Sequence, residues 1–153
     1  MKKEEIIKKL NLEPLIPEGG YVRSMYRGKN VNDRESYGTI YYLLTPDTVS
    51  RMHKLEDDEI WYYHDGPALE MYLIYEDHDE VRYLGKDIMN NEEPQIRVKA
   101  GVYMGAHMKE NGEYTLVSTS MAPAYIDEEF SLGSYDLLKN KSNHLQLLEL
   151  LTK

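Results

Sequence analysis

The sequence predicts an all-β fold, in which short antiparallel strands are flanked by a short helix at each end. Nine runs with the two-residue period of strands follow one another between residues 21 and 121. No helical stretch of crossover length separates them, and a parallel sheet needs such crossovers. The pattern therefore favours an antiparallel sandwich or barrel. At 153 residues the chain fits a single domain with one core.

The N-terminal segment is expected to form a short leading helix over residues 2–10. Ile6, Ile7 and Leu10 can share one helical face, and two prolines end the pattern by residue 17. The Gly19-Gly20 pair then opens the region in which the period changes to two. We expect the barrel to extend from about residue 19 to about residue 131.

The strands of this region are short and closely spaced, and turn residues separate them. The Asn111-Gly112 pair accepts the positive φ angles of a type I′ turn, so it predicts a hairpin between the two strands that flank it. Pro46-Asp47 and Asp65-Gly66-Pro67 mark two further turns. The expected strands are 21–27, 35–45, 50–55, 59–64, 69–76, 80–84, 95–99, 103–109 and 113–121.

The C-terminal residues, about 134–152, are expected to form a helical tail. Ser142 can cap a helix that runs through His144 to Leu151, and five leucines make this helix too apolar to remain in water. It is expected to dock on its own barrel or on a second subunit.

Charge and composition exclude several classes of function. The chain has 27 acidic residues against 18 Lys and Arg, a formal net charge of −9, which repels phosphate backbones and anionic membranes. Neither nucleic acid nor a membrane is expected as a partner. The chain has no cysteine, so it has no disulfides or thiolate nucleophiles. With no apolar leader or run of roughly 18 apolar residues, we expect a soluble, unprocessed, cytoplasmic protein.

The stretch SRMHKLEDDEIWYYHDG, residues 50–66, carries the clearest motif. Its spacing, His53-x-Leu55-x3-Glu59-x6-Gly66, resembles the first cupin motif, in which two histidines and a glutamate hold a metal. Leu55 stands in place of the second histidine. The second cupin motif, Pro-x-Gly-x-x-His, has its best match at residues 99–104, where lysine replaces the proline and Met104 replaces the histidine.

Most of the chain resembles one cupin family, domain-of-unknown-function family 985. The resemblance implies an RmlC-like jelly roll, that is, a double-stranded β-helix, with residues 1–153 forming one cupin domain. It also implies a homodimer, but no assigned reaction. One departure is Ile16, where the family usually has histidine. The matching pieces are PEGGY (17–21), TIYYLLT (39–45), SRMH (50–53), DEIW (58–61), PQ (94–95) with AGV (100–102), and TLV (115–117) followed by MAP (121–123).

If the barrel holds a metal, His53 and Glu59 are the only motif ligands that remain. Met104 offers a soft thioether, which favours Cu(I) over harder ions. A two-ligand site would be weak, so no cofactor is expected beyond a weakly bound divalent metal. We expect purified protein to carry far less than one equivalent of transition metal.

The same residues also predict a small-molecule pocket. Strand parity places Trp61 and Tyr63 on the face of Glu59, and it turns His64 and His107 away from the lumen. Tyr41, Tyr103 and Met104 are expected to complete the wall. His53 and Glu59 would then be polar anchors, although they could equally satisfy each other in a purely structural pair.

Three functions remain open at this stage. The first is binding of a small molecule. By analogy with cupin-type sugar epimerases this would be a carbohydrate or a nucleotide-sugar-like ligand, but a shared fold does not settle function. The second is an isomerase, an epimerase or a weakly metal-dependent enzyme, with His53 as base and Glu59 as the carboxylate that orients it. The third is a structural dimer without a ligand.

Two charged groups outside the motif have simpler explanations. The run Arg23, Arg27, Lys29 and Arg34 could attract an anionic ligand to one rim, or it could protect an exposed edge strand. The acids at positions 56–58 are expected to be solvated in a loop.

Overall fold

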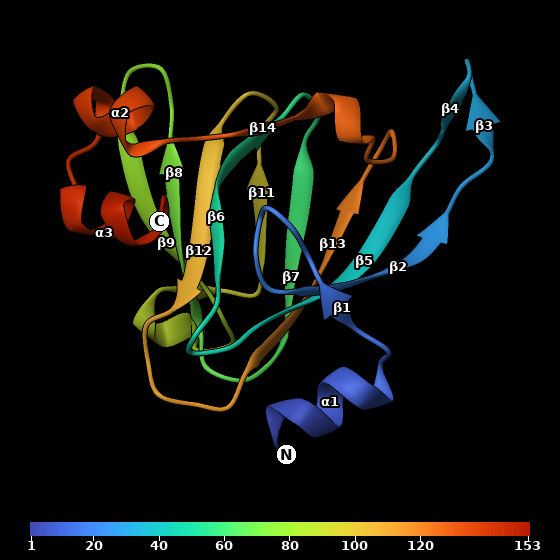
Figure 1. The fold of residues 1–153 in the computed structure, drawn as a ribbon, viewed down its shortest axis with the longest axis horizontal. Helices are drawn as coiled ribbons and strands as arrows, with labels where there is room; N and C mark the ends of the chain where they lie inside the picture. Colours follow the sequence, from blue (N-terminus) through green and yellow to red (C-terminus); the bar gives the residue numbers. More distant parts are fainter.

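The computed structural model describes residues 1–153 and consists of two six-stranded sheets that pack face to face (Figure 1). The pairs are antiparallel, except that β10 (Glu92–Glu93) and β9 (Asp79–Leu84) are parallel. The first sheet has the order β1 (Glu13–Pro14), β2 (Tyr21–Arg27), β5 (Gly38–Leu44), β13 (Thr115–Met121), β7 (Glu59–Asp65) and β11 (Gln95–Val98). The second has the order β10, β9, β8 (Leu69–Ile74), β12 (Tyr103–Met108), β6 (Val49–Leu55) and β14 (Phe130–Leu132).

Short elements extend from these sheets. β3 (Asn30–Val31) and β4 (Arg34–Glu35) form a hairpin that projects beyond the body of the molecule (Figure 1). The helices are α1 (Lys3–Lys9), α2 (Tyr135–Leu138) and α3 (Leu145–Leu150), with 3-10 turns η1 (Ile88–Asn90), η2 (Asp127–Glu129) and η3 (Lys139–Lys141). None of these helices is long and apolar enough to cross a membrane.

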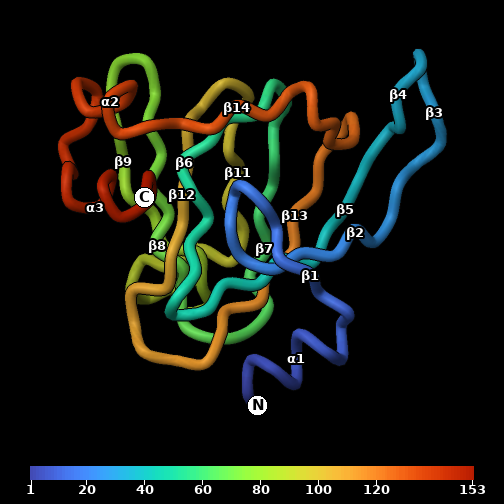
Figure 2. The backbone as a smooth tube through the Cα atoms, viewed as in Figure 1, coloured from blue at the N-terminus to red at the C-terminus, as the bar shows by residue number.

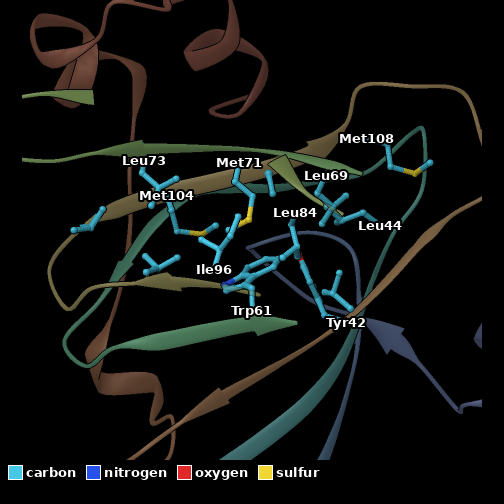
Figure 3. Packing of buried hydrophobic residues seen from close by; sticks show 14 residues of the cluster. Tyr42, Leu44, Trp61, Leu69, Met71, Leu73, Leu84, Ile96, Met104 and Met108 are labelled. Atoms are coloured by element: carbon cyan, nitrogen blue, oxygen red, sulfur yellow. The ribbon is translucent and has the colours of Figure 1, made fainter. Parts of the chain in front are cut away.

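The main core fills the space between the two sheets (Figure 3). Trp61 lies near its centre, and its ring meets that of Tyr42 edge to face at a centroid distance of 5.7 Å. The strict alternation of buried and half-buried residues along β13 agrees with one face in this core. The all-β prediction is therefore confirmed.

The two helical ends cover the outer faces of the barrel. Leu148 and Leu151 are fully buried with Met52, Tyr72 and Ile74 on the outer side of the second sheet. Full burial of a leucine is worth about 1.5–3 kcal/mol, so the tail is held by its own barrel. Helix α1 covers the outer face of the first sheet in the same way.

The predicted hairpin at Asn111-Gly112 is wrong. β12 pairs with β6 and β8 in one sheet, whereas β13 pairs with β5 and β7 in the other. The chain therefore crosses between the sheets at this point, and it does the same at Pro46-Asp47 and at residues 65–67 (Figure 2). Turn chemistry indicated where the strands end, but burial of both inner faces decides which strands pair.

The predicted cap of the last helix is also wrong. Helix α3 begins after His144, and no side chain caps it. Ser142 instead bonds to the hydroxyl of Tyr72, while Ser134 caps α2 by accepting from the amide of Leu137. The helix expected to run through His144 to Leu151 is nevertheless present as α3, and the preceding residues of the tail form α2 and η3.

Candidate functional site

A bulge in β6 brings Ser50 and His53 to the same carboxylate. Met104 of β12 pairs with His53, but Ala106 pairs with Ser50, so β6 contains one extra residue. The Ser50 hydroxyl donates to Glu18 Oε2 at 2.8 Å, and His53 Nε2 lies 3.8 Å from Glu18 Oε1. Side chains three positions apart would face opposite sides of a regular strand, and the bulge removes that difference.

The loop that carries Glu18 lies tightly on β6. The Glu18 carbonyl accepts a hydrogen bond from the Arg51 amide at 2.8 Å. The loop also closes on itself, because the Gly19 amide donates to the Leu15 carbonyl at 2.8 Å. Gly19 has a φ of +108°, and a Cβ there would lie 2.0 Å from the Val49 carbonyl oxygen. Only glycine fits, so this contact fixes Glu18 at the barrel.

A cavity of about 460 Å³ lies between this loop, the first sheet and the segment that follows β13. It extends from buried Glu59 to Ile16, which is 84% exposed, so it reaches the surface. The polar side chains of its wall are Glu18, Ser24, Arg27, Thr39, Glu59, Thr119, Tyr125 and Asp127, and the apolar ones are Leu15, Ile16, Pro17, Val22, Ile40, Leu55, Met121 and Phe130.

Glu59 is the most buried acid of this wall, with 8% of its surface exposed. Trp61 Nε1 donates to Glu59 Oε1 at 2.9 Å. Burial raises the pKa of Glu59, and the charge of Glu18 raises it further, while His53 and the hydrogen bonds of Thr119 and Trp61 act in the opposite direction. The cavity therefore contains a carboxyl group that binds its proton more tightly than a solvated glutamate.

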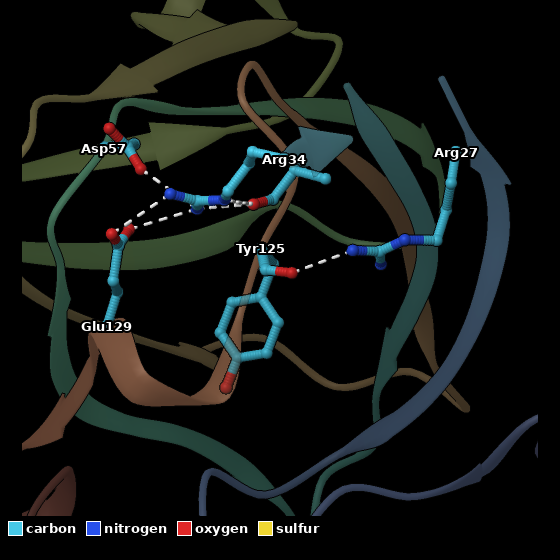
Figure 4. A network of polar contacts seen from close by, with 6 residues as sticks. Arg27, Arg34, Asp57, Tyr125 and Glu129 are labelled. Carbon is cyan, nitrogen blue, oxygen red and sulfur yellow. Dashed lines mark hydrogen bonds and ion pairs between the residues drawn. The ribbon is translucent and has the colours of Figure 1, made fainter. Parts of the chain in front are cut away.

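Residues 122–130, which we call the strap, close one side of the cavity. Two arginines from the β2–β5 side hold it (Figure 4). Arg34 donates to the Ala124 carbonyl and pairs with Asp57 at 3.2 Å and Glu129 at 3.1 Å. Arg27 donates to the Tyr125 carbonyl at 2.9 Å.

The charges around Arg34 depend on one another. Its hydrogen bonds lower the pKa of Glu129, whereas burial and the neighbouring Glu129 raise the pKa of Asp57. Asp57 is thus paired and half-buried, and Asp58 accepts from the Ala100 amide at 2.8 Å. Glu56 and Asp58 are exposed, as expected, whereas the expectation is wrong for Asp57, whose side chain is half-buried and paired with Arg34.

His53 does not pair with Glu59 as proposed from the motif. Its Nδ1 lies 2.6 Å from the Arg51 carbonyl oxygen, which can only accept, so the backbone and not a carboxylate orients the ring. The ring is 2% exposed and stacks on Phe130 at a centroid distance of 5.3 Å. His53 and Glu59 share only a small space beside Leu55 and Met104, and Glu59 alone reaches the large cavity.

Other predicted wall residues lie elsewhere. Tyr41 packs under α1 and Tyr103 under the C-terminal tail, both on outer faces of the barrel, so placing them in the cavity was wrong. Trp61, Tyr63 and Met104 belong to the main core or pack against it and do not line the large cavity.

The prediction from strand parity that two histidines point away from the lumen is correct. His64 is exposed and its Nε2 lies 2.6 Å from the Ser118 hydroxyl. His107 pairs with Glu70 of β8, with Nε2 2.8 Å from Oε1, and both residues lie on the face of the second sheet opposite Met71 and Met104.

The residues do not fit the metal centre of the cupin motif. No group of three or more His, Cys, Asp or Glu side chains is arranged to share an ion. Leu55 offers no ligand atom and Met104 only a soft thioether, so His53 and Glu59 are left as an incomplete pair of ligands. We therefore derive no chemistry through a metal.

Sequence reasoning missed Glu18, Tyr125 and Asp127 as residues of the cavity. They come from the loop before β2 and from the strap, which have no strand period. The only sequence signal was that PEGGY, which contains Glu18, and MAP, which begins in β13 just before the strap, are among the pieces shared with the family.

Two sheets around an apolar core, with a cavity open at one side, define a cupin barrel. A family model described as cupin superfamily (DUF985) matches residues 4–133, and the chain belongs to this family. A solved structure of a protein from Shewanella oneidensis is 33% identical, with a TM-score of 0.92, covering 100% of this chain and 98% of that one.

Other structures extend the likeness. A hypothetical protein from Leishmania major is 27% identical, with a TM-score of 0.90 and 99% of both chains covered. Oxalate decarboxylase from Bacillus subtilis is 13% identical with a TM-score of 0.61, over 94% of this chain and 35% of that one, which supports the fold alone. No curated protein matches the chain.

Proposed function

We propose that this protein binds a small, hydroxyl-bearing, carbohydrate-like molecule in the cavity beside Glu59. The observation that carries the proposal is the cavity itself, whose volume of about 460 Å³ lies within the usual range for ligand sites. Its wall combines apolar and hydrogen-bonding side chains in equal number, which suits a ligand that has both an apolar face and polar substituents.

The polar groups favour a ligand with hydroxyls. Ser24, Thr39 and Thr119 can each donate or accept, and Glu18 and Glu59 accept. The ring of Phe130 adds an apolar surface against which a sugar ring can pack. A nucleotide-sugar is disfavoured, because its diphosphate would meet three acids and one arginine that is already bonded.

A thermal-shift screen of neutral, cationic and anionic carbohydrates tests this function, with calorimetry on the best compound. A ligand that binds only the folded state raises the melting temperature. Thr119→Val should weaken the response, because it removes a hydroxyl from the wall. Ser118→Ala, one residue away and paired with His64 outside the barrel, is the matched control. If no compound of the panel shifts melting at millimolar concentration, the proposed function is wrong.

A second candidate function, proton transfer in an isomerase or epimerase, is favoured by the raised pKa of Glu59. His53 is a poorer candidate for the base, since it does not line the large cavity. Incubation of the best ligand in D2O, followed by NMR, tests this chemistry. Exchange of a carbon-bound hydrogen that Glu59→Gln abolishes would support it, and a bound ligand that exchanges no hydrogen would count against it.

The cellular location of the protein and its lack of binding to nucleic acid are also proposals. The lack of cysteine and the acidic composition fit a cytoplasmic protein that does not bind nucleic acid. Fractionation of cells that express the tagged chain would test the location.

A further inference from the structure

The charged side chains of the cavity wall are unequal in sign. Three acids line it, Glu18, Glu59 and Asp127, against one base, Arg27. Arg27 is already committed, because its Nε donates to Glu35 at 2.6 Å and its Nη2 to the Tyr125 carbonyl. A ligand in the cavity would therefore meet more negative than positive charge.

The neighbouring bases do not change this balance. Arg34 is held by Asp57, Glu129 and the Ala124 carbonyl, and it does not line the cavity. His53 faces Glu18 from behind the wall, with its Nδ1 proton directed to the Arg51 carbonyl. Within the basic run that could have attracted an anion, Arg27 and Arg34 are thus committed, and Arg23 and Lys29 do not line the cavity.

The aromatic part of the wall suits a cation as well. Tyr125 and Phe130 both line the cavity, and a ring face attracts an ammonium group within about 6 Å of its centre. Burial and a hydrogen bond to Asp127 raise the pKa of Tyr125, so its phenol adds no charge of its own. The two rings can therefore contact the cation and the apolar face of one ligand.

Glu18 and Glu59 give the most specific position for such a group. Both carboxylates line the cavity, the charge of Glu18 acts on Glu59, and neither is paired with an arginine or lysine. Glu18 is bonded by a serine and Glu59 by a tryptophan, both neutral donors. An ammonium group carries three donors, so it could bond to both acids and relieve their repulsion.

We propose that the ligand of this cavity carries a protonated amine, as an amino sugar or an amino polyol does, with the ammonium between Glu18 and Glu59. This inference rests on the proposed function, and it adds the charge class of the ligand.

A charge-matched series of three polyols tests the inference: D-glucamine, D-sorbitol and D-gluconate, which have six-carbon chains ending in an ammonium, a hydroxyl and a carboxylate. Affinity for each is measured by calorimetry at pH 7. We expect glucamine to bind at least about tenfold more tightly than sorbitol, as for a charge-assisted hydrogen bond, and gluconate to bind most weakly. Added salt should weaken the binding of glucamine and leave the binding of sorbitol unaffected.

Variants then locate the ammonium. Glu18→Gln and Glu59→Gln should each bring the glucamine-to-sorbitol affinity ratio toward one. Glu56→Gln removes the same charge from an exposed position outside the cavity and should leave the ratio unchanged. Melting curves verify that each variant is folded, and the ratio within a variant is independent of its stability.

The outcomes separate the two proposals. If sorbitol or gluconate binds as tightly as glucamine, the inference is overturned while the proposed function stands. If Glu56→Gln lowers the ratio as much as the cavity variants, the effect is one of overall charge and the inference is again overturned. If none of the three polyols binds and the wider carbohydrate panel also fails, both proposals fall.

Discussion

Glu59 occupies a position that raises the pKa of its carboxyl group. Its carboxyl group is buried, accepts from Trp61 and lies within the field of Glu18, and burial is the largest cause of its raised pKa. A group with a raised pKa binds protons more readily in the folded than in the unfolded chain. Its ionisation therefore destabilises the fold as the pH rises above the ordinary value of 4.5.

We therefore predict that Glu59→Gln melts at a higher temperature than wild type at pH 7 to 8. The amide oxygen can still accept from Trp61, and the ionisation penalty is gone. Below the ordinary pKa of 4.5 the difference should vanish, because Glu59 is then protonated in both states. Calorimetric melting of both proteins from pH 4 to pH 8 measures this difference in melting temperature. A variant that is less stable than wild type at every pH would contradict this account.

At the scale of elements, the strap depends on a few polar contacts. Arg34 joins the Ala124 carbonyl, Asp57 and Glu129, which belong to three separate segments. The strap carries Tyr125 and Phe130 into the cavity wall, so its position sets the shape of the site. Loss of this arginine would leave two acids beside each other, and repulsion between them would push the strap away.

Arg34→Gln should lower the melting temperature and raise amide hydrogen exchange in residues 122–130 severalfold. Lys29→Gln, on the same projecting hairpin but exposed and free of an ion pair in this structure, is the matched control. Mass spectrometry of deuterated peptides gives the comparison. Unchanged exchange in the strap, with exchange raised elsewhere, would mean that Arg34 stabilises the hairpin and not the strap.

The sequence predicted the strands better than it predicted their faces. Periodicity located β6, β7 and β13, and the motif spacing placed His53 and Glu59 at one small space. It failed in β5, where Tyr41 and Tyr42 are adjacent and helix α1 covers the outer face, so both faces are shielded and alternation is lost. Only the register against β13, in which Val117 pairs with Tyr42, puts Tyr42 inside.

On the scale of the whole molecule, the fold and the packing of the apolar terminal helices on the barrel follow from local sequence patterns. The cavity does not. Glu18 reaches the site through a β-bulge and a glycine contact, and the strap residues reach it through Arg34. Each of these depends on a contact between segments far apart in the chain. Such contacts leave no period in the sequence, so the site could be predicted only in part.

The projecting hairpin is the part of the molecule that its own chain covers least. Tyr26, Val31 and Tyr37 are 64%, 58% and 47% exposed on β2, β3 and the turn before β5. Beyond Val22, β2 has no partner strand on its outer edge, because β1 pairs with only two of its residues. A two-stranded ribbon is marginal alone, and an exposed edge favours pairing with another strand.

We predict that a second copy of this chain covers this edge, giving a homodimer at micromolar concentration. The double variant Tyr26→Lys with Val31→Lys should be monomeric, because like charges and lost apolar area oppose association. Met89→Lys, at a residue 91% exposed on η1 away from the hairpin, should remain dimeric. Light scattering measures the mass of each. A wild-type monomer would refute the dimer, and dissociation of Met89→Lys alone would move the interface to the opposite side of the barrel.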